Sequence, residues 1–258
     1  ILYRLVGSEM CIRDRLSARA DIAVKRGAMD DALEMHRKAL EIQVKLRDSV
    51  GAARSYNNMG YIFRRRRDTR HALEVYSNVE KLLESEHHPE LCQARIRMAA
   101  AYLEMGELDR ARDALRAFEE TEEGDSDISH ARAMAVLGRY YARVKENELA
   151  MQYYSKALDI LSDQTDPHSA VEVSMLLGQV LNDADRKEEA SEQYIDALVL
   201  AEANDFRMLQ GEILARLGEV ESDRSQKMDY LQRSLSVFRE LGAVDRMREV
   251  QNSRYTGL

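Results

Sequence analysis

The sequence predicts an all-α protein built from repeated pairs of helices. Only 12 Gly and 2 Pro occur in 258 residues, which leaves few of the breaks that a turn-rich β protein needs. The 12 Met and 12 Tyr lie mostly at helical spacing, as expected of core positions on amphipathic helices. Small residues also recur at a fixed interval of 39 or 40 residues, and such a period is typical of a helical repeat.

The first fifteen residues are predicted to be foreign to the natural protein. Leu5 to Arg15 reads LVGSEMCIRDR, which resembles the translation of a transposase-based sequencing adapter. A natural short amphipathic segment is the alternative. We therefore leave residues 1–15 out of the fold prediction, expect no role for Cys11, and expect the natural protein to begin further upstream.

From Leu16 onward, five repeats align on a small residue in the second helix of each pair, called helix B; the first helix is called helix A. Small residues at both places predict that the two helix backbones approach closely. The helix-B residues are Ala32, Ala72, Ala111, Ala150 and Ala190, and the helix-A residues, twelve positions earlier, are Ala20, Gly60, Ala99, Gly138 and Gly178. Four residues after each helix-B alanine stand His36, Tyr76, Leu115, Tyr154 and Tyr194.

The clearest repeat unit is the stretch from Met134 to Leu158. Its signature residues are Leu137-Gly138 and Tyr141, followed by Ala150, Tyr154 and Ala157-Leu158. These positions match the signature of the tetratricopeptide repeat, and the stretch resembles that family. The resemblance implies a right-handed α-solenoid of antiparallel helix pairs, a superhelix that binds other proteins and is not an enzyme.

Asp166-Pro167 predicts the start of the fifth helix A, because it combines a capping carboxylate with proline at the first helical position. A sixth, irregular repeat then keeps the pattern Leu217-Gly218, 40 residues after Gly178. The turn after it is predicted to be about three residues shorter, so that Ser234-Leu235 takes the place of the usual Ala-Leu.

The last segment is predicted to cover the end of the array. Val244, Met247 and Val250 form a narrow apolar stripe on a mostly polar segment, as expected of a capping helix. We therefore expect a single array over residues 16–250 and a tail over residues 251–258.

Charge and cysteine content narrow the functional classes. The net charge of −8 argues against nucleic acid as a partner. No apolar run approaches the roughly 20 residues of a membrane-spanning helix, so we expect no membrane partner. Two cysteines cannot form a disulfide framework, which favours a reducing compartment, and we expect the cytoplasm.

The resemblance implies that ligands bind along the concave face lined by the A helices. Carried over to this sequence, the inner positions make that face basic in the first half and acidic in the second. The residues predicted to bind a peptide are Arg54, Asn57, Asn58, Tyr61, Arg64, Arg65, Ile96, Arg97, Leu103, Arg132, Arg139 and Arg143. Arginine pairs well with carboxylates, so we predict an acidic or C-terminal carboxylate segment across repeats two to four. The alternative is that these arginines pair with Glu or Asp of the neighbouring repeat.

Two functions stay open at this point. The first is a non-catalytic scaffold for a protein or peptide partner. The second is the regulatory part of a larger bacterial signalling protein, such as a kinase, cyclase, ATPase or transcription regulator, because repeats near 40 residues resemble those of bacterial signalling arrays. The gene sequence upstream of the adapter-like segment would discriminate between them. The sequence does not predict an oligomeric state.

Other motifs predict little. Only Asn58 and Arg97 match the pattern of the chaperone-tail clamps in this family, so we expect no such clamp. The arginine run 64–67 falls at the end of a helix, where cations complement the helix dipole without a ligand. No Cys/His spacing supports a metal site, and no phosphate-binding loop or nucleophile motif is present. We expect no metal, no cofactor and no catalytic residue.

Overall fold

The computed structural model describes residues 2–83, 88–119, 128–162 and 166–256. Within them every regular element is an α-helix, so the all-α prediction is confirmed. Contacts between helices divide the chain into two compact units, Ile1–Glu120 and Thr121–Leu258, which we describe separately. The single array predicted over residues 16–250 stays a prediction.

The first unit contains three helix pairs. They are α1 (Leu2–Lys25) with α2 (Met29–Lys45), α3 (Ser49–Arg65) with α4 (Thr69–Leu82), and α5 (Pro89–Met105) with α6 (Leu108–Glu119). Each helix packs on the next one in the chain, and α3 also contacts α5, so successive A helices touch. The predicted foreign segment and the start of the first repeat share one unbroken helix, α1.

The second unit contains three further pairs and a last helix. They are α7 (Ile128–Arg143) with α8 (Asn147–Ser162), α9 (Pro167–Asp183) with α10 (Lys187–Ala203), α11 (Arg207–Val220) with α12 (Arg224–Glu240), and α13 (Val244–Thr256). The A helices again contact each other, α7 with α9 and α9 with α11. The tail predicted from residue 251 is wrong at its start, because α13 continues to Thr256; residues 257–258 lie outside the described part.

Short turns reverse the chain within each pair. In the first five pairs the turn contains one residue with positive φ, which ends helix A in a left-handed conformation: Gly27, Arg67, Gly106, Lys145 and Asp185. After Arg67, the amide of Asp68 donates to the carbonyl of Phe63 at 2.9 Å, which satisfies an otherwise free carbonyl at the helix end. The carboxylate of Asp68 then caps α4 by accepting a hydrogen bond from the amide of His71. The arginine run is therefore the end of α3 and its turn.

Glycine in helix A makes room for an aromatic ring from helix B of the same pair. A Cβ added at Gly138 or Gly178 would lie 2.6 Å from a ring carbon of Tyr154 or Tyr194, respectively. The small helix-B residue Ala150 is also fully buried. The sequence predicts that the two helix backbones approach closely. In these pairs the close contact is made in part by the tyrosine ring of helix B against the backbone of helix A. Where helix A carries alanine instead, the equivalent helix-B residue is not tyrosine but His36 or Leu115.

The sixth pair follows the same rule with a shift of three residues. The helix α11 ends two residues after Gly218, whereas α9 ends five residues after Gly178, so the shortening predicted for the turn lies in the helix instead. As a result Leu231 covers Gly218, with a Cδ atom 2.7 Å from an added Cβ. The Ser234 hydroxyl donates to the carbonyl of Gly211 at 2.7 Å, and the ring of Phe238 covers the same glycine.

Only part of the apolar stripe that is predicted for the last helix is buried. Val250 is buried and packs with Leu231 and Phe238, and Met247 packs against this cluster. Val244 is 54% exposed, so its assignment to the stripe was wrong. It is the first residue of α13 and stands at the end of the helix rather than over the cluster.

We predict that Gly178→Ala lowers the free energy of unfolding by up to about 2 kcal/mol. Alanine is about 1 kcal/mol better than glycine in an exposed helix. Here, however, the new methyl group would meet the Tyr194 ring at 2.6 Å, and overpacking costs about 1–3 kcal/mol. Urea unfolding followed by circular dichroism measures the change.

The double variant Gly178→Ala/Tyr194→Leu is the control, because it reproduces the Ala99–Leu115 combination of the third pair. Its loss of stability should be smaller than the sum of the two single losses by about 1 kcal/mol or more. Strict additivity would contradict the ring-on-glycine contact.

His36 is a buried histidine without a hydrogen-bond partner. Its side chain is 1% exposed, and neither ring nitrogen has a partner within the described residues. Burial lowers the pKa of His36 below its ordinary 6.5, and the nearby carboxylate of Asp21 opposes this only in part. The folded protein therefore keeps the ring neutral, while the unfolded chain takes up a proton near neutral pH.

This difference predicts a loss of stability in mild acid. Below about pH 6.5 the unfolded state binds the extra proton, so the free energy of unfolding falls by up to about 1.4 kcal/mol per pH unit until the folded-state pKa is reached. His36→Leu, which copies Leu115, should lack this component. Urea unfolding of both proteins between about pH 7 and pH 5 tests it; parallel curves would contradict the prediction.

Candidate functional site

The predicted binding residues of the first unit lie on α3 and α5, and some of them are buried. Asn57 is fully buried, Leu103 is 1% exposed and Ile96 is 7% exposed. The prediction that Ile96 and Leu103 offer apolar contact to a ligand is therefore wrong for this structure. The reason is that α5 packs on α3, α4 and α6 at once, which covers most of its surface.

Asn57 joins two successive A helices. Its side-chain amide donates to the backbone carbonyl of Glu90 at 2.8 Å and to the Glu90 carboxylate at 3.0 Å. In the opposite direction, the guanidinium of Arg97 donates to the backbone carbonyl of Asn57 at 2.8 Å. These bonds tie the middle of α3 to α5, so Asn57 holds the repeats together instead of facing a ligand.

Several of the predicted arginines pair with a carboxylate of the next repeat. Arg54 contacts Glu90 at 2.9 Å, and Arg64 contacts Glu104 at 2.5 Å. The alternative that the sequence leaves open therefore applies to both of these arginines. Each pair is partly exposed, so its contribution to stability is small, of the order of 1 kcal/mol or less.

The remaining residues of this face are accessible. Tyr61 is 39% exposed, and the Arg97 guanidinium lies 5.9 Å from its ring centroid, within cation–π range. Asn58 lines a polar pocket together with Arg54 and Asp21. Arg65 is exposed and has no acidic partner within 4 Å among the described residues. This face therefore combines an accessible ring, an amide and several guanidinium groups.

Sequence reasoning missed Tyr76 as a part of this face. The ring of Tyr76 lies on Gly60, and its hydroxyl is buried without a hydrogen-bond partner. Burial raises the pKa of Tyr76, and the nearby guanidinium groups of Arg97 and Arg64 lower it in part. The Gly60–Tyr76 combination was visible in the sequence, but nothing there indicates which charged groups lie near the hydroxyl.

In the second unit, Arg132, Arg139 and Arg143 lie on α7. Arg132 contacts the capping carboxylate of Asp166 at 3.3 Å, so it too pairs with the next repeat. Arg139 lies close to Tyr154; burial raises the pKa of that tyrosine, and the guanidinium opposes the rise. Arg139 and Arg143 have no acidic partner within 4 Å among the described residues.

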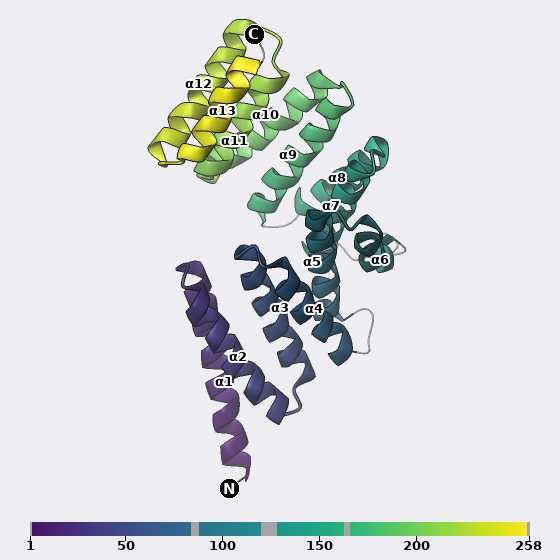
Figure 1. Cartoon of the computed structure of the whole chain (residues 1–258), viewed down its shortest axis with the longest axis vertical. Helices are drawn as coiled ribbons and strands as arrows, with labels where there is room; N and C mark the ends of the chain where they lie inside the picture. Colours follow the sequence, from purple (N-terminus) through teal and green to yellow (C-terminus); the bar gives the residue numbers. More distant parts are fainter. Residues whose placement is uncertain (1, 84–87, 120–127, 163–165, 257–258) are drawn as a thin grey trace. The chain divides into compact units, whose positions relative to one another are not determined.

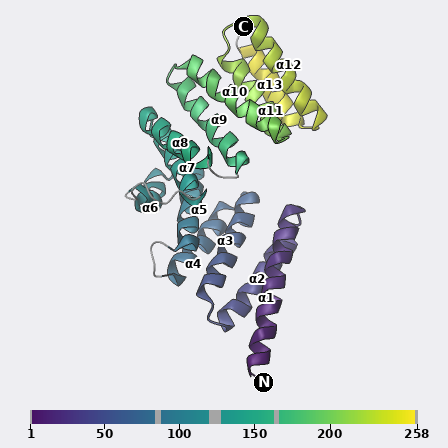
Figure 2. The same cartoon turned by 180° about the vertical axis from the view of Figure 1, so that it is seen from behind.

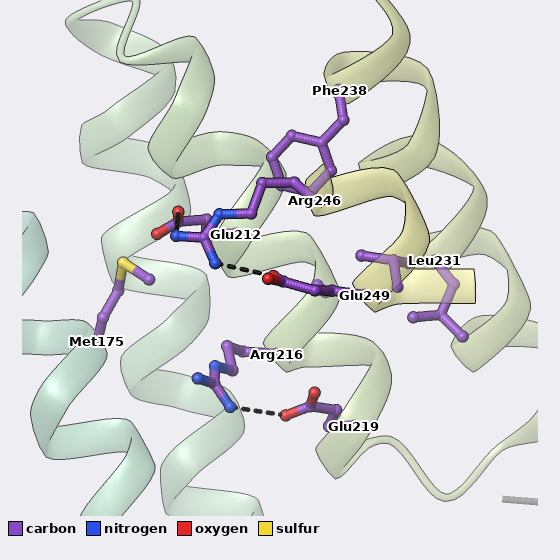
Figure 3. Close-up of a pocket in the computed structure, with 10 residues that line it drawn as sticks. Met175, Glu212, Arg216, Glu219, Leu231, Phe238, Arg246 and Glu249 are labelled. Carbon is purple, nitrogen blue, oxygen red and sulfur yellow. Dashed lines mark hydrogen bonds and ion pairs between the residues drawn. The ribbon is translucent and has the colours of Figure 1, made fainter. Parts of the chain in front are cut away.

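Part of the inner face that is predicted to be acidic lines a pocket of about 220 Å³ in the second unit. Its lining includes Met175 of α9, Glu212 of α11 and Phe238 of α12. Figure 3 shows Arg246 of α13 between Glu212 and Glu249, at 2.9 and 2.8 Å respectively. The last helix therefore supplies the counter-charge for the acidic inner face of α11.

Among the described residues, no group of three or more His, Cys, Asp or Glu side chains is arranged to hold a metal ion. None of the helices in that part of the chain is both long and apolar enough to cross a membrane.

The hydrogen bonds of Asn57 predict a loss of stability in Asn57→Ala. Removing the side chain deletes its hydrogen bonds to the backbone carbonyl and the carboxylate of Glu90, and the loss of a bond to a charged acceptor costs about 1–3 kcal/mol. Asn58→Ala is the matched control, since no side-chain hydrogen bond of Asn58 is found among the described residues, and it should change stability by less than about 0.5 kcal/mol. Equal losses in urea unfolding would contradict the assignment.

Comparison with known proteins supports the repeat assignment. Two models of the tetratricopeptide repeat match the sequence, one over residues 16–85 and the other over residues 96–170. None of the curated protein sequences compared with the chain matches it.

Solved structures match over almost the whole chain. The apo form of RapI has a TM-score of 0.73 at 15% identity, covering 94% of this chain and 97% of that chain. A signal-transduction ATPase with a tetratricopeptide repeat sensor, from Pyrococcus horikoshii, has a TM-score of 0.73 at 18% identity, covering 96% of this chain and 37% of that chain. A Rap protein complexed with competence and sporulation factor has a TM-score of 0.67 at 15% identity, covering 95% and 75%.

At these identities the structural likeness shows the fold alone, an α-solenoid built of helix pairs. The two matched stretches together span more than half of the sequence. The chain therefore belongs to the tetratricopeptide repeat family.

Proposed function

We propose that this protein is a non-catalytic scaffold that binds an acidic peptide segment of a partner protein on the inner face of its A helices. Tetratricopeptide repeats are interaction modules, and a Rap protein with this fold was solved in complex with competence and sporulation factor. The acidic character of the ligand is inferred from the arginines of this chain.

The observation that carries the proposal is the accessible face of α3 and α5. There the half-exposed ring of Tyr61 lies beside the Arg97 guanidinium, with Arg65 on the same helix as Tyr61. An exposed aromatic ring gives contact area at low entropic cost, and guanidinium groups recognise carboxylates with two parallel hydrogen bonds. A peptide bearing carboxylates meets both needs.

The rest of the surface is consistent with a protein partner in the cytoplasm. The chain carries a net charge of −8, which opposes binding to nucleic acid or to an anionic membrane. A local group of arginines on an otherwise acidic protein attracts an acidic segment while the remaining surface repels most acidic macromolecules.

Charge reversal tests the proposal. Arg65→Glu in the first unit and Arg139→Glu/Arg143→Glu in the second change only arginines that lack an acidic partner among the described residues, so the fold should be retained. We expect each variant to weaken binding of a fluorescein-labelled Ala-Glu repeat peptide about tenfold or more, since each charged contact contributes about 1.5–3 kcal/mol. Fluorescence anisotropy measures the affinity.

Arg37→Glu/Arg70→Glu is the matched control, because it makes the same charge change on the exposed surfaces of the B helices α2 and α4. It should leave binding within about twofold of the wild type. Binding that is weakened equally by the control variant would point to the overall charge and contradict a site on the A helices.

A second candidate function is a sensor segment that regulates a larger signalling protein. The likeness to the Pyrococcus horikoshii ATPase favours it, since this chain covers 37% of that protein, which contains a tetratricopeptide repeat sensor. Reading the gene upstream of residue 1 tests this function. A kinase, cyclase, ATPase or DNA-binding domain there would support it, and a start codon close by would contradict it.

A further inference from the structure

Two buried hydrogen-bond donors without partners lie on α3 and α4, which pack against each other. They are the hydroxyl of Tyr76 and the Nε–H group of Arg64, and both atoms are buried within the described structure. Tyr76 itself is fully buried, with its ring held on Gly60. Buried donors without an acceptor are costly, so such a cluster favours any group that can supply acceptor oxygens.

Charged groups of α3 and α5 act on the Tyr76 hydroxyl. The ionised groups that act on it are the guanidinium groups of Arg97 and Arg64 and the carboxylate of Glu104. The carboxylate of Glu104 contacts only the terminal nitrogen of Arg64, at 2.5 Å, and leaves the Nε–H group of Arg64 unused.

The position of Glu104 allows another carboxylate to displace it from Arg64. Its side chain is 42% exposed, whereas the Tyr76 hydroxyl is inaccessible. An ion pair with an exposed carboxylate contributes little to stability, so exchanging Glu104 for another carboxylate costs little. A ligand carboxylate that contacts both Nε and the terminal nitrogen of Arg64 would form two parallel hydrogen bonds, whereas Glu104 forms only one.

We propose that a carboxylate of the bound peptide displaces Glu104 from Arg64, pairs with both edge nitrogens of that arginine, and accepts a hydrogen bond from the Tyr76 hydroxyl. Arg97 adds a second positive charge. Glu104 is then a resident competitor that occupies the carboxylate subsite in the free protein. This inference rests on the proposed function and assigns it one subsite with named donors.

Two substitutions separate this subsite from a purely structural cluster. Tyr76→Phe removes only the hydroxyl and should weaken binding of the amidated Ala-Glu repeat peptide about tenfold, the value of one hydrogen bond to a charged acceptor. Because the hydroxyl has no partner in the free protein, Tyr76→Phe should leave urea unfolding unchanged or raise the midpoint. Glu104→Gln removes the competitor and should tighten binding severalfold.

Matched controls exist for both substitutions. Tyr194→Phe removes the equivalent hydroxyl from the ring on Gly178, and Glu107→Gln removes a carboxylate that contacts Arg110 instead of Arg64. Neither should change the affinity. Repeating the titration with the same peptide carrying a free C-terminus distinguishes the two sources of carboxylate. Dependence on Tyr76 for both peptides assigns the subsite to side-chain carboxylates, and dependence only for the free C-terminus assigns it to the terminal carboxylate.

Failure of the subsite and failure of the proposed function can be told apart. If the wild type binds the peptide and Tyr76→Phe and Glu104→Gln bind equally well, the subsite is refuted and the scaffold proposal stands. If no peptide binds, the acidic-ligand proposal fails, and titration with sodium acetate at constant ionic strength still tests the subsite. A shift of the Arg64 Nε–H resonance that is reduced in Tyr76→Phe would support it, and the absence of any shift would overturn it.

Discussion

The contact of a helix-B side chain with the backbone of helix A is the constraint on which the structure of each pair depends. A tyrosine ring can lie against helix A only where the opposing residue has no Cβ, as at Gly138 and Gly178. Where helix A has alanine, the partner position holds Leu115 or His36 instead. The size of the residue in helix A therefore limits the size of the side chain that helix B can place against it. The distance between the two helices of a pair depends on these two volumes together.

Most of the fold could be predicted from the sequence because these contacts are local. Both partners of each contact lie within one repeat, sixteen residues apart in the case of Gly138 and Tyr154. Turn chemistry is equally local, as at Asp166, whose side chain caps α9 as predicted. The ends of the array were harder to predict. The exposed position of Val244 depends on how far α13 extends over the preceding pair.

The candidate site was predicted less well, because it depends on contacts between repeats. The inner positions of the family include Tyr61, which is accessible, and also Asn57, which is buried. The spacing of residues on α3 cannot show that Glu90, more than thirty positions away, takes both donors of that amide. The same holds for Tyr76, which the sequence indicates as a packing residue and the structure also places beside Arg64 and Arg97.

The hydrogen bonds between α3 and α5 have a mechanical consequence. Arg54, Asn57 and Arg64 each join one repeat to the next, through Glu90 or Glu104. Rearranging these pairs changes the forces that fix the tilt of one A helix against its neighbour. In a solenoid, where each unit touches only its neighbours, a small change of tilt at one junction moves everything beyond that junction as a lever arm. Exchange of these carboxylates therefore changes the contacts between successive A helices in this part of the chain.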